Sequence, residues 1–525
     1  MADKLFRTYY NEKTELSAAL DAGKILVQSG TDEPKKVDAN LFASQLDLNS
    51  KENTSNKQNS LAVDGTGLKY PTVDAVNAAN DIQNTELQLS QKFTSFGESY
   101  VNNFRSSMLD LGDEFFTSSA GYQIGKNKQL GLEPSLQMLP ISGQAGKLRS
   151  IGSNRVNDFT IARNSTATYI DEDGLIKTAL ANVPRFDYYD SLDPSLLLEP
   201  QGTNLFTYSE DFSDASWIKS GFGTGSVAIA TSNFSISPDG SQTADRLIVD
   251  LNGGSSGGDQ SLIQKNVNVS NGSYNRSIYI KTNDNSIKQI LLACSAADIN
   301  FTKITVNGNW QRFNITNNVT SSSTNIVVGL RNAGGVTGLS DSADLSIWGA
   351  QAEQSSVASS YIPTSGSTVT RLADVVDGAG DVNTFNSTEG VLYAEIKTNQ
   401  ALGNGFGITL NNGGFSNRVF IGKNSANSSV VAIISVSGNV VNISGGNYSD
   451  TEFKKIAISY KSGETKLFLN GSQIGSTSLT TYTLPSLISL NFDGGGVASF
   501  YGECKDIRVY NTALTDAQLT ELTTL

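Results

Sequence analysis

The sequence contains no histidine, and this absence narrows the chemistry that the chain can perform near neutral pH. Histidine is the usual general base at that pH and a principal zinc ligand, so Ser-His or Cys-His nucleophiles and most zinc sites are excluded. Any catalysis would rest on carboxylates, tyrosine or lysine. Cysteine is also scarce, since only Cys294 and Cys504 are present, in what we interpret as different domains. Two such distant thiols predict buried free cysteines rather than a disulfide.

Charged residues make up only 17% of the 525 positions, and the net charge is −13. Because phosphate binding needs clusters of Lys and Arg, this balance argues against nucleic acid as a partner. No apolar run is long enough to span a bilayer, and the first residues, MADKLFRTYYNEK, lack the apolar core of a secretory signal. What is abundant is glycine, with 49 residues, besides Asn, Ser and Thr. This composition is typical of β-rich extracellular or virion proteins with several domains.

Residues 1–50 are short, polar and mixed in character. Residues 14–23 predict a short helix that ends at a glycine, and residues 24–30 predict a strand followed by a turn. Such a segment is too small to bury a core of its own. We interpret it as a docking segment that orders against another protein, with a flexible terminus as the alternative.

Residues 51–111 predict a turn-rich lead-in followed by a helical coiled-coil stalk. From position 73 onward, apolar or small residues recur at spacings of three and four, which indicates one apolar stripe along a helix of roughly 55 Å. A lone helix of this kind is poorly stable, and a homotrimer would bury the stripe. The alternative is one helix packed on its own globular domain, because Glu86 and Gly97 interrupt the heptads. The predicted trimer seam consists of Ala75, Ala79, Ile82, Leu89, Phe93, Phe96, Tyr100, Phe104, Met108 and Leu111.

The remainder of the chain predicts a mainly β protein with two antiparallel β-sandwich (jelly-roll) domains. Residues 112–202 form an irregular connecting region that includes two predicted strands around a turn at Asp173-Gly174. Residues 203–370 contain many short alternating segments separated by turns, which predict the first jelly roll. After a linker over 371–388, residues 389–525 predict a second β module.

Two segments resemble virion proteins of tailed bacteriophages. SNKQNSLAVDGTGLKYPTVDAVNA, at 55–78, resembles a segment of phage fibre and tail proteins that leads into a trimeric stalk. The motifs RNSTATY, NVPR and SLLLEPQGTNL, between residues 163 and 205, resemble a connecting region of such proteins. That resemblance implies no known chemistry, so we interpret Asp171, Glu172 and Glu199 as structural residues.

Two further segments resemble carbohydrate-binding folds. IWGAQAEQSSVASSYIPTSGSTVTR, at 347–371, resembles the closing strand of jelly rolls of the carbohydrate-binding-module type. ISYKSGETKLFLNGSQIGS and KDIRVYNTALTDAQLTEL resemble the laminin-G-like and concanavalin-like lectin fold. This second resemblance implies a hairpin, a closing strand and a short helix, for which Thr515 is a suitable N-cap.

The lectin-like fold includes both glycan hydrolases and pure binders, so the site residues decide between them. Hydrolases of this family carry Glu-x-Asp-x-x-Glu on one strand, which this sequence lacks, and Glu389 and Glu395 stand isolated. We therefore expect no enzymatic activity and no cofactor, except for a possible calcium ion. The candidate calcium ligands are Asp493 and Asp506, with solvated acidic loops as the alternative. The candidate glycan-binding residues are Phe415, Arg418, Tyr448 and Tyr482.

The three tryptophans are a second set of possible sugar platforms, because aromatic faces pack on sugar rings. Trp310 and Trp348 lie in the middle of predicted strands, so we expect them to pack in the core. The sequence does not indicate a role for Trp217.

Together these features predict a homotrimeric fibre protein on the virion surface of a tailed bacteriophage. We expect host attachment through receptor binding to surface or environmental glycans, with the N-terminal segment docked on capsid or tail proteins. A tail fibre is favoured over a head fibre, and neither nucleic acid nor membrane insertion is expected. The alternatives are a tailspike enzyme that degrades capsular polysaccharide and a purely structural spacer.

Overall fold

The structure is a computed structural model in which the chain divides into two units, residues 1–133 and 134–525. In the first unit it describes two antiparallel strand pairs: β1 (Lys24–Val27) with β2 (Lys35–Asp38), and β3 (Ala62–Val63) with β4 (Lys69–Tyr70). The strand predicted from Lys24 is thereby confirmed. The other described residues are 133–138, 148, 150–151, 158–189, 193–294, 300–398, 407–424, 427–448, 452–496 and 499–524.

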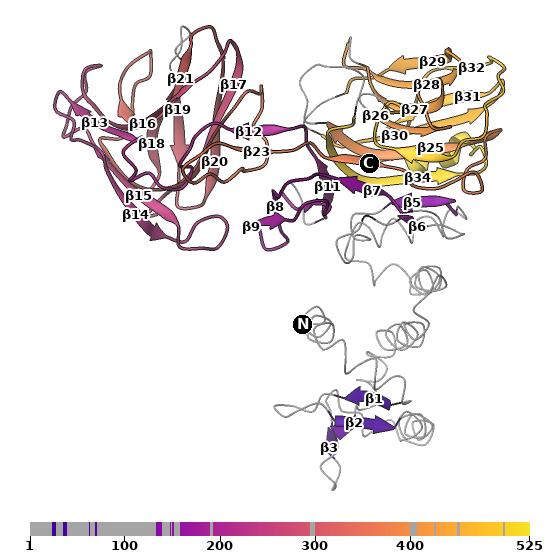
Figure 1. Cartoon of the computed structure of the whole chain (residues 1–525), viewed down its shortest axis with the longest axis horizontal. Coiled ribbons are helices and arrows are strands. Elements are labelled where there is room, and N and C mark those ends of the chain that lie inside the picture. Colours follow the sequence, from indigo (N-terminus) through magenta and orange to yellow (C-terminus); the bar gives the residue numbers. More distant parts are fainter. Residues whose placement is uncertain are drawn as a thin grey trace. The chain divides into compact units, whose positions relative to one another are not determined.

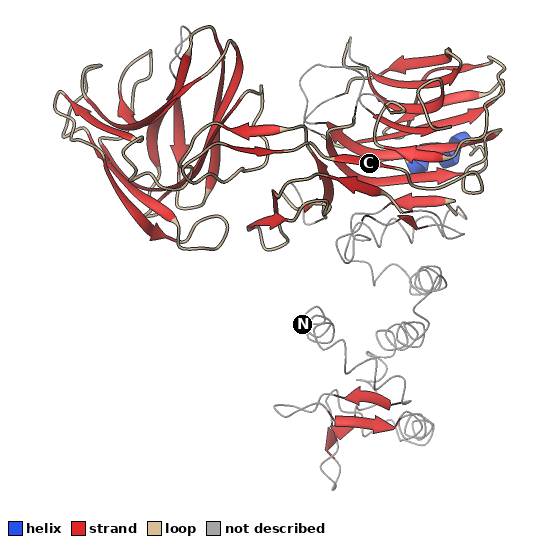
Figure 2. Cartoon of the chain, in the orientation of Figure 1, coloured by secondary structure: helices blue, strands red, loops and turns tan. Residues whose placement is uncertain are grey.

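The stalk remains a prediction, because every seam residue from Ala75 to Leu111 lies outside the described residues, as does the helix expected at 14–23. The described residues are mainly β, as predicted (Figure 2). Their one helix, α7 (Asp516–Leu522), is short, and no helix among them is long and apolar enough to cross a membrane.

The first β module, residues 203–370, is a sandwich of two five-stranded antiparallel sheets (Figure 1). One sheet has the order β13 (Ile218–Phe222), β16 (Gln260–Asn268), β21 (Ser323–Arg331), β18 (Lys288–Cys294) and β19 (Asn300–Val306). The other has the order β14 (Ile229–Ser235), β15 (Ala244–Asp250), β22 (Ser342–Glu353), β17 (Gly272–Thr282) and β20 (Gln311–Val319). The predicted jelly-roll sandwich is therefore confirmed.

Alternation along the strands explains how this sandwich forms. On β17, Ile278 and Ile280 point into the shared core, whereas Tyr279 lies on the other face of the sheet. Two details differ from the sequence prediction. The alternating segment SVAIAT predicts a strand from Ser226, but β14 begins at Ile229, and no alternating segment predicts β13. Both are edge strands whose side chains are largely exposed, so they lack the apolar alternation that marks the inner strands.

The second β module, residues 389–525, also has two sheets around one core. The five-stranded sheet has the order β29 (Asn439–Gly445), β28 (Val430–Val436), β27 (Asn417–Lys423), β26 (Gly407–Asn411) and β33 (Ser489–Asn491). The larger sheet includes β34 (Gly502–Tyr510), β25 (Glu389–Thr398), β30 (Lys454–Lys461), β31 (Thr465–Leu469) and β32 (Ser472–Ser478). The predicted hairpin and the closing strand are confirmed in β30, β31 and β34.

The closing helix is confirmed as well. Thr515 caps α7 in a reciprocal capping box with Gln518, and Leu519 and Leu522 form the buried side of the helix. The cysteines also follow the prediction, because Cys294 and Cys504 are both free and buried.

The connecting region is more ordered than the sequence predicted. Its β11 (Ser195–Leu198) pairs with β34, so it belongs to the larger sheet of the second module, together with β5 (Leu136–Met138), β6 (Ser150–Ile151) and β10 (Phe186–Asp187). FTIARNSTATYI, at 159–170, is the first of the two strands predicted around Asp173-Gly174, but the structure divides it into β7 (Thr160–Ala162) and β8 (Ala167–Ile170). The remaining short strands are β9 (Ile176–Ala179), which pairs with β8, β12 (Gly202–Asn204), β23 (Val369–Arg371) and β24 (Val375–Asp377). β12 pairs with β23, and β7 pairs with β24.

Candidate functional site

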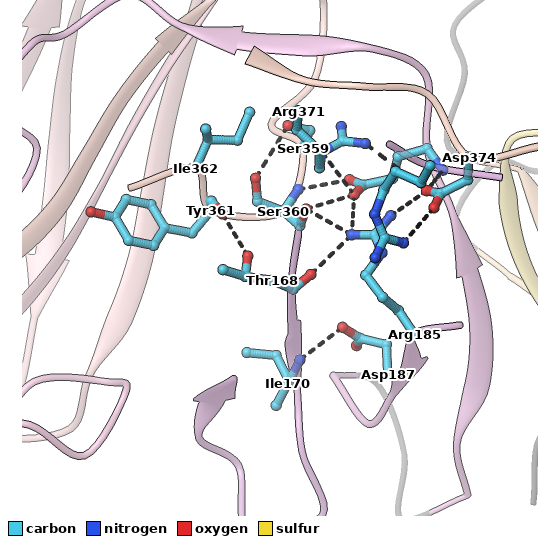
Figure 3. Close-up of polar contacts among 12 residues, drawn as sticks. Thr168, Ile170, Arg185, Asp187, Ser359, Ser360, Tyr361, Ile362, Arg371 and Asp374 are labelled. Atoms are coloured by element: carbon cyan, nitrogen blue, oxygen red, sulfur yellow. Dashed lines mark hydrogen bonds and ion pairs between the residues drawn. The ribbon is translucent and has the colours of Figure 1, made fainter. Parts of the chain in front are cut away.

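Five buried charged residues hold the connecting region to the start of the linker that follows the first module. We call Arg163, Arg185, Glu199, Arg371 and Asp374 the arginine cluster. Figure 3 labels three of its members, Arg185, Arg371 and Asp374. The Asp374 carboxylate accepts hydrogen bonds from Arg163 Nη1 at 2.8 Å and from Arg185 Nη2 at 2.5 Å. Arg185 Nη1 also donates to Glu199 Oε2 at 2.6 Å. Arg371 Nε lies 3.6 Å from Glu199 Oε2 and makes no hydrogen bond of its own. The cluster links positions that are more than 150 residues apart.

Glu199 is charged in this cluster despite its burial. Burial alone raises the pKa of the carboxyl, but Arg371 and Arg185, together with hydrogen bonds from Ser360, lower the pKa to about 2. Ser360 donates both its N–H and its hydroxyl to this carboxylate, at 2.7 and 2.6 Å. These contacts fit the structural interpretation of Glu199. Asp171 also has a structural role, because its Oδ1 accepts hydrogen bonds from the backbone N–H groups of Asp173 and Leu175 in the adjoining turn.

The arginine cluster adjoins a pocket of about 470 Å³. One wall comes from β8, the end of β10 and Tyr189, and another comes from β20 and the segment 356–361 that follows β22. Glu199 and the ion pair between Lys397 of β25 and Glu503 of β34, at 2.7 Å, also line the pocket. Arg185 fixes these two walls to each other, because its Nη1 donates to Thr168 O and to Ser360 Oγ, both at 2.9 Å. Figure 3 shows the Arg185 guanidinium beside both segments, with dashed lines to Thr168 and Ser360. The polar lining includes Tyr169, Asp187, Tyr189, Tyr279, Arg312 and Asn314.

Two charged side chains of this pocket come from different walls. Arg312 donates to Ser359 O at 2.6 Å and to Ser277 Oγ at 2.9 Å, and its guanidinium lies 5.4 Å from the centre of the Tyr279 ring. Asp187 accepts from the N–H groups of Ile170 and Tyr189, at 3.0 and 2.8 Å. Burial nevertheless raises the pKa of Asp187 to about 6. No motif in the sequence singled out either side chain.

A second candidate site lies at a loop edge of the second module. Phe415, between β26 and β27, is 50% exposed, and the guanidinium of Arg418 lies 3.9 Å from its ring centre. Arg418 also donates to the backbone O of Gly494. The two loops approach closely because position 495 is glycine with a φ of 94°; a Cβ there would come within 3.0 Å of Phe415 Cα. The edge therefore presents one aromatic face above a buried cation.

Asp493 belongs to the same edge. Its two carboxylate oxygens accept from the N–H groups of Gly495 and Gly496, at 2.7 and 2.9 Å, so the carboxylate shapes its own loop. Asp506, the other predicted calcium ligand, is buried and ion-paired with Arg508. Among the described residues, no group of three or more acidic, Cys or His side chains is placed to hold a metal ion.

The other two predicted glycan residues are not part of this edge. Tyr448 is buried in the core, where its hydroxyl lies 3.4 Å from Ile396 O. Tyr482 packs partly buried against the same core and bonds Thr465 Oγ1 at 2.8 Å. The structure thus brings together Phe415 and Arg418 from the predicted set, whereas both tyrosines pack inward.

The sequence also missed one carboxylate pair. Glu395 on β25 lies directly opposite Asp506 on β34 in the strand register. Burial raises the pKa of both carboxyls, although Lys455 opposes the shift at Glu395 and Arg508 opposes it at Asp506. Glu395 appeared isolated because its neighbour is more than 100 positions away. Gln137 and Arg508 both donate to the Asp506 carboxylate, as expected for a structural pair.

The tryptophans are mainly core residues. Trp217 and Trp348 are each 1% exposed, which confirms the prediction for Trp348 and assigns Trp217 to the core as well. Trp310 is only partly buried, and it packs beside Trp348 with its Nε1 donating to Ile236 O at 3.1 Å.

Comparison with known proteins supports the lectin-like fold of the second module. Residues 381–520 match the family described as the concanavalin A-like lectin/glucanases superfamily. No curated protein sequence matches the chain.

Solved structures overlap with parts of the chain. One is the CBM40 of the Ruminococcus gnavus IT-sialidase bound to α2,3-sialyllactose, with 14% identity, 27% of this chain and 84% of that chain covered, and a TM-score of 0.24. Another is domain 4 of AbnA, an arabinanase of Geobacillus stearothermophilus, in complex with arabinotriose, with 18% identity, coverages of 31% and 81%, and a TM-score of 0.23.

Proposed function

We propose that the chain is a non-enzymatic, glycan-binding fibre subunit on the virion surface of a tailed bacteriophage. The observation that carries the adhesive part is the exposed face of Phe415 above Arg418, within the module that matches the lectin superfamily. An aromatic face of this kind packs against the C–H groups of a sugar ring, and the neighbouring loop offers polar groups for its hydroxyls. Asp506, which lies opposite Glu395 in the strand register, is engaged by Arg508, which favours binding over hydrolysis.

The fibre part of the proposal is supported by the sequence. The segment 55–78 and the motifs between 163 and 205 resemble tailed-phage virion proteins. In this proposal, residues 1–50 dock on tail or capsid proteins, with a tail fibre favoured over a head fibre. Three copies on one rod would place several weak sugar sites together, so that high effective concentration compensates for the weakness of each site.

Replacing Phe415 with alanine is expected to weaken glycan binding about tenfold, because the apolar face that covers the sugar ring is lost. The measurement is retention of the purified full chain on immobilised host-surface polysaccharides and on a glycan array. Phe222→Ala is the matched control, since this phenylalanine is 68% exposed on β13 of the other module. Equal binding by both variants and the unchanged chain would contradict the assigned site. New reducing ends after incubation with polysaccharide would instead favour the tailspike alternative.

The oligomeric state tests the stalk separately. Sedimentation equilibrium of the full chain is expected to give about three times the 55.8 kDa of one chain, because the apolar stripe is buried only between copies. Phe93→Asp and Phe104→Asp, which place charges on the predicted seam, are expected to shift the mass towards one chain. A stable single chain at working concentration, without any substitution, would refute the trimeric stalk.

A further inference from the structure

The pocket beside the arginine cluster contains an arginine that the fold does not neutralise. Arg312 and Arg185 both bind the segment 359–360, but only Arg185 meets carboxylates, those of Glu199 and Asp374. The partners of Arg312 are a backbone carbonyl and a hydroxyl, and no carboxylate among the described residues forms an ion pair with it. Its Nε–H also lacks a hydrogen-bond acceptor. A guanidinium has five N–H donors; the Nε–H of Arg312 is buried, so one N–H on each of Nη1 and Nη2 remains for a ligand.

Asp187, which comes from the wall opposite Arg312, has a complementary character. Its carboxylate accepts from two backbone N–H groups but has no cation beside it among the described residues. The remaining lone pairs of such a carboxylate suit neutral donors such as sugar hydroxyls, whereas a second carboxylate placed there would be repelled. The pocket therefore has one end that favours an anion and one end that favours hydroxyl donors.

The aromatic side chains of the pocket suit a ring-shaped ligand. Tyr189 is 69% exposed, although the N–H of its own backbone is fixed by Asp187. Tyr279 packs on Trp348 with ring centres 5.7 Å apart, so its ring is held in place below Arg312. Because the arginine cluster also fixes both walls, little ordering is required when a ligand binds.

We propose that this pocket binds a carboxylate-bearing sugar residue of an acidic polysaccharide, with the carboxylate on Arg312 and the ring hydroxyls near Asp187. This inference extends the proposed glycan adhesion to a second site, distinct from Phe415, and specifies the ligand class as polyuronate-like. Arginine is suited to this role because its planar donors match the geometry of a carboxylate. Burial raises the pKa of Asp187 to about 6, so the carboxyl is still mostly ionised at neutral pH and can accept hydrogen bonds from ring hydroxyls.

The test compares binding of the full chain to polyuronates of galacturonate, glucuronate and mannuronate, each paired with its methyl ester. Esterification removes the charge and preserves the ring. At least one acid form is expected to bind ten times more tightly than its ester, and Arg312→Gln is expected to abolish that preference. Arg312→Lys should retain part of it, because the charge remains. Arg331→Gln is the matched control, since Arg331, on β21, also donates to a backbone carbonyl, that of Gly257.

A second variant covers the case in which Arg312→Gln disturbs the fold. Tyr189→Ala removes an exposed side chain, so it should leave the unfolding temperature unchanged and weaken binding of the acid form. Phe415→Ala should keep the preference for the acid form, because the two sites are separate. If no acid form is preferred while neutral glycans still bind through Phe415, the inference fails and the proposed adhesion stands. If the preference survives Arg312→Gln in a folded variant, the assignment of Arg312 is wrong.

Discussion

Replacing Glu199 with glutamine is expected to lower the free energy of unfolding by about 3 kcal/mol at neutral pH. The variant removes the carboxylate that faces Arg185 and Arg371, both of which are buried. Breaking a buried ion pair from one side costs about 3–5 kcal/mol, because the remaining charge stays buried and uncompensated. Urea unfolding of the full chain, followed by circular dichroism at pH 7, measures the difference. Glu464→Gln is the control, since its ion pair with Lys466 is exposed and contributes about 0–1 kcal/mol.

The same variant has a defined pH dependence. The pKa of Glu199 in the folded chain is about 2, below the ordinary value of 4.5. Its stabilisation is therefore fully present above pH 4.5 and is lost as the pH falls through about 2. The difference between the unchanged chain and Glu199→Gln should shrink as the pH is lowered from 5 towards 2. A difference that is absent at pH 7, or that grows on acidification, would contradict the role of the cluster.

The strands were largely predictable from the sequence, and the arginine cluster was not. Alternation of apolar and polar residues over short distances predicts strands such as β17 and β30, because one face of each must be buried. The pairing of Arg163 with Asp374 depends instead on a fold that brings positions 211 residues apart into contact. The motifs around Arg163 and Arg185 resemble those of phage virion proteins. The sequence alone did not indicate which carboxylates pair with these two arginines.

The residues of the candidate sites also differ in whether the sequence predicts them. Phe415 and Arg418 lie three positions apart at one hairpin, so their contact follows from local geometry. Tyr448 and Tyr482 belong to polar, turn-rich stretches that suggest exposed loops, yet tertiary packing turns both rings towards the core. Arg312 sits on an ordinary strand, and only the segment 356–361 and the connecting region make a pocket around it. Sites assembled from distant segments leave no local pattern to find.

Trp217→Ala is expected to destabilise the first module by about 3–5 kcal/mol, which is the usual cost of removing a large aromatic side chain from a core. The indole is 1% exposed, and its ring centre lies 4.6 Å from Phe212 and 5.7 Å from Phe206. Its Nε1 also donates to Tyr208 O at 2.8 Å. Urea unfolding followed by circular dichroism, which reports on strand content, provides the measurement.

Two companion variants separate the contributions of packing, hydrogen bonding and sugar contact. Trp217→Phe keeps much of the packed volume and leaves the carbonyl of Tyr208 without its donor, so a loss of about 1–3 kcal/mol is expected. Trp310→Ala removes a partly buried ring at the edge of the Trp348 cluster, so its cost should be smaller than that of Trp217→Ala. If Trp217 is only a core residue, the Trp217→Ala chain should lose glycan binding only to the extent that the first module unfolds. A fully folded Trp217→Ala chain that no longer binds glycans would reverse the assignment and make Trp217 a sugar platform after all.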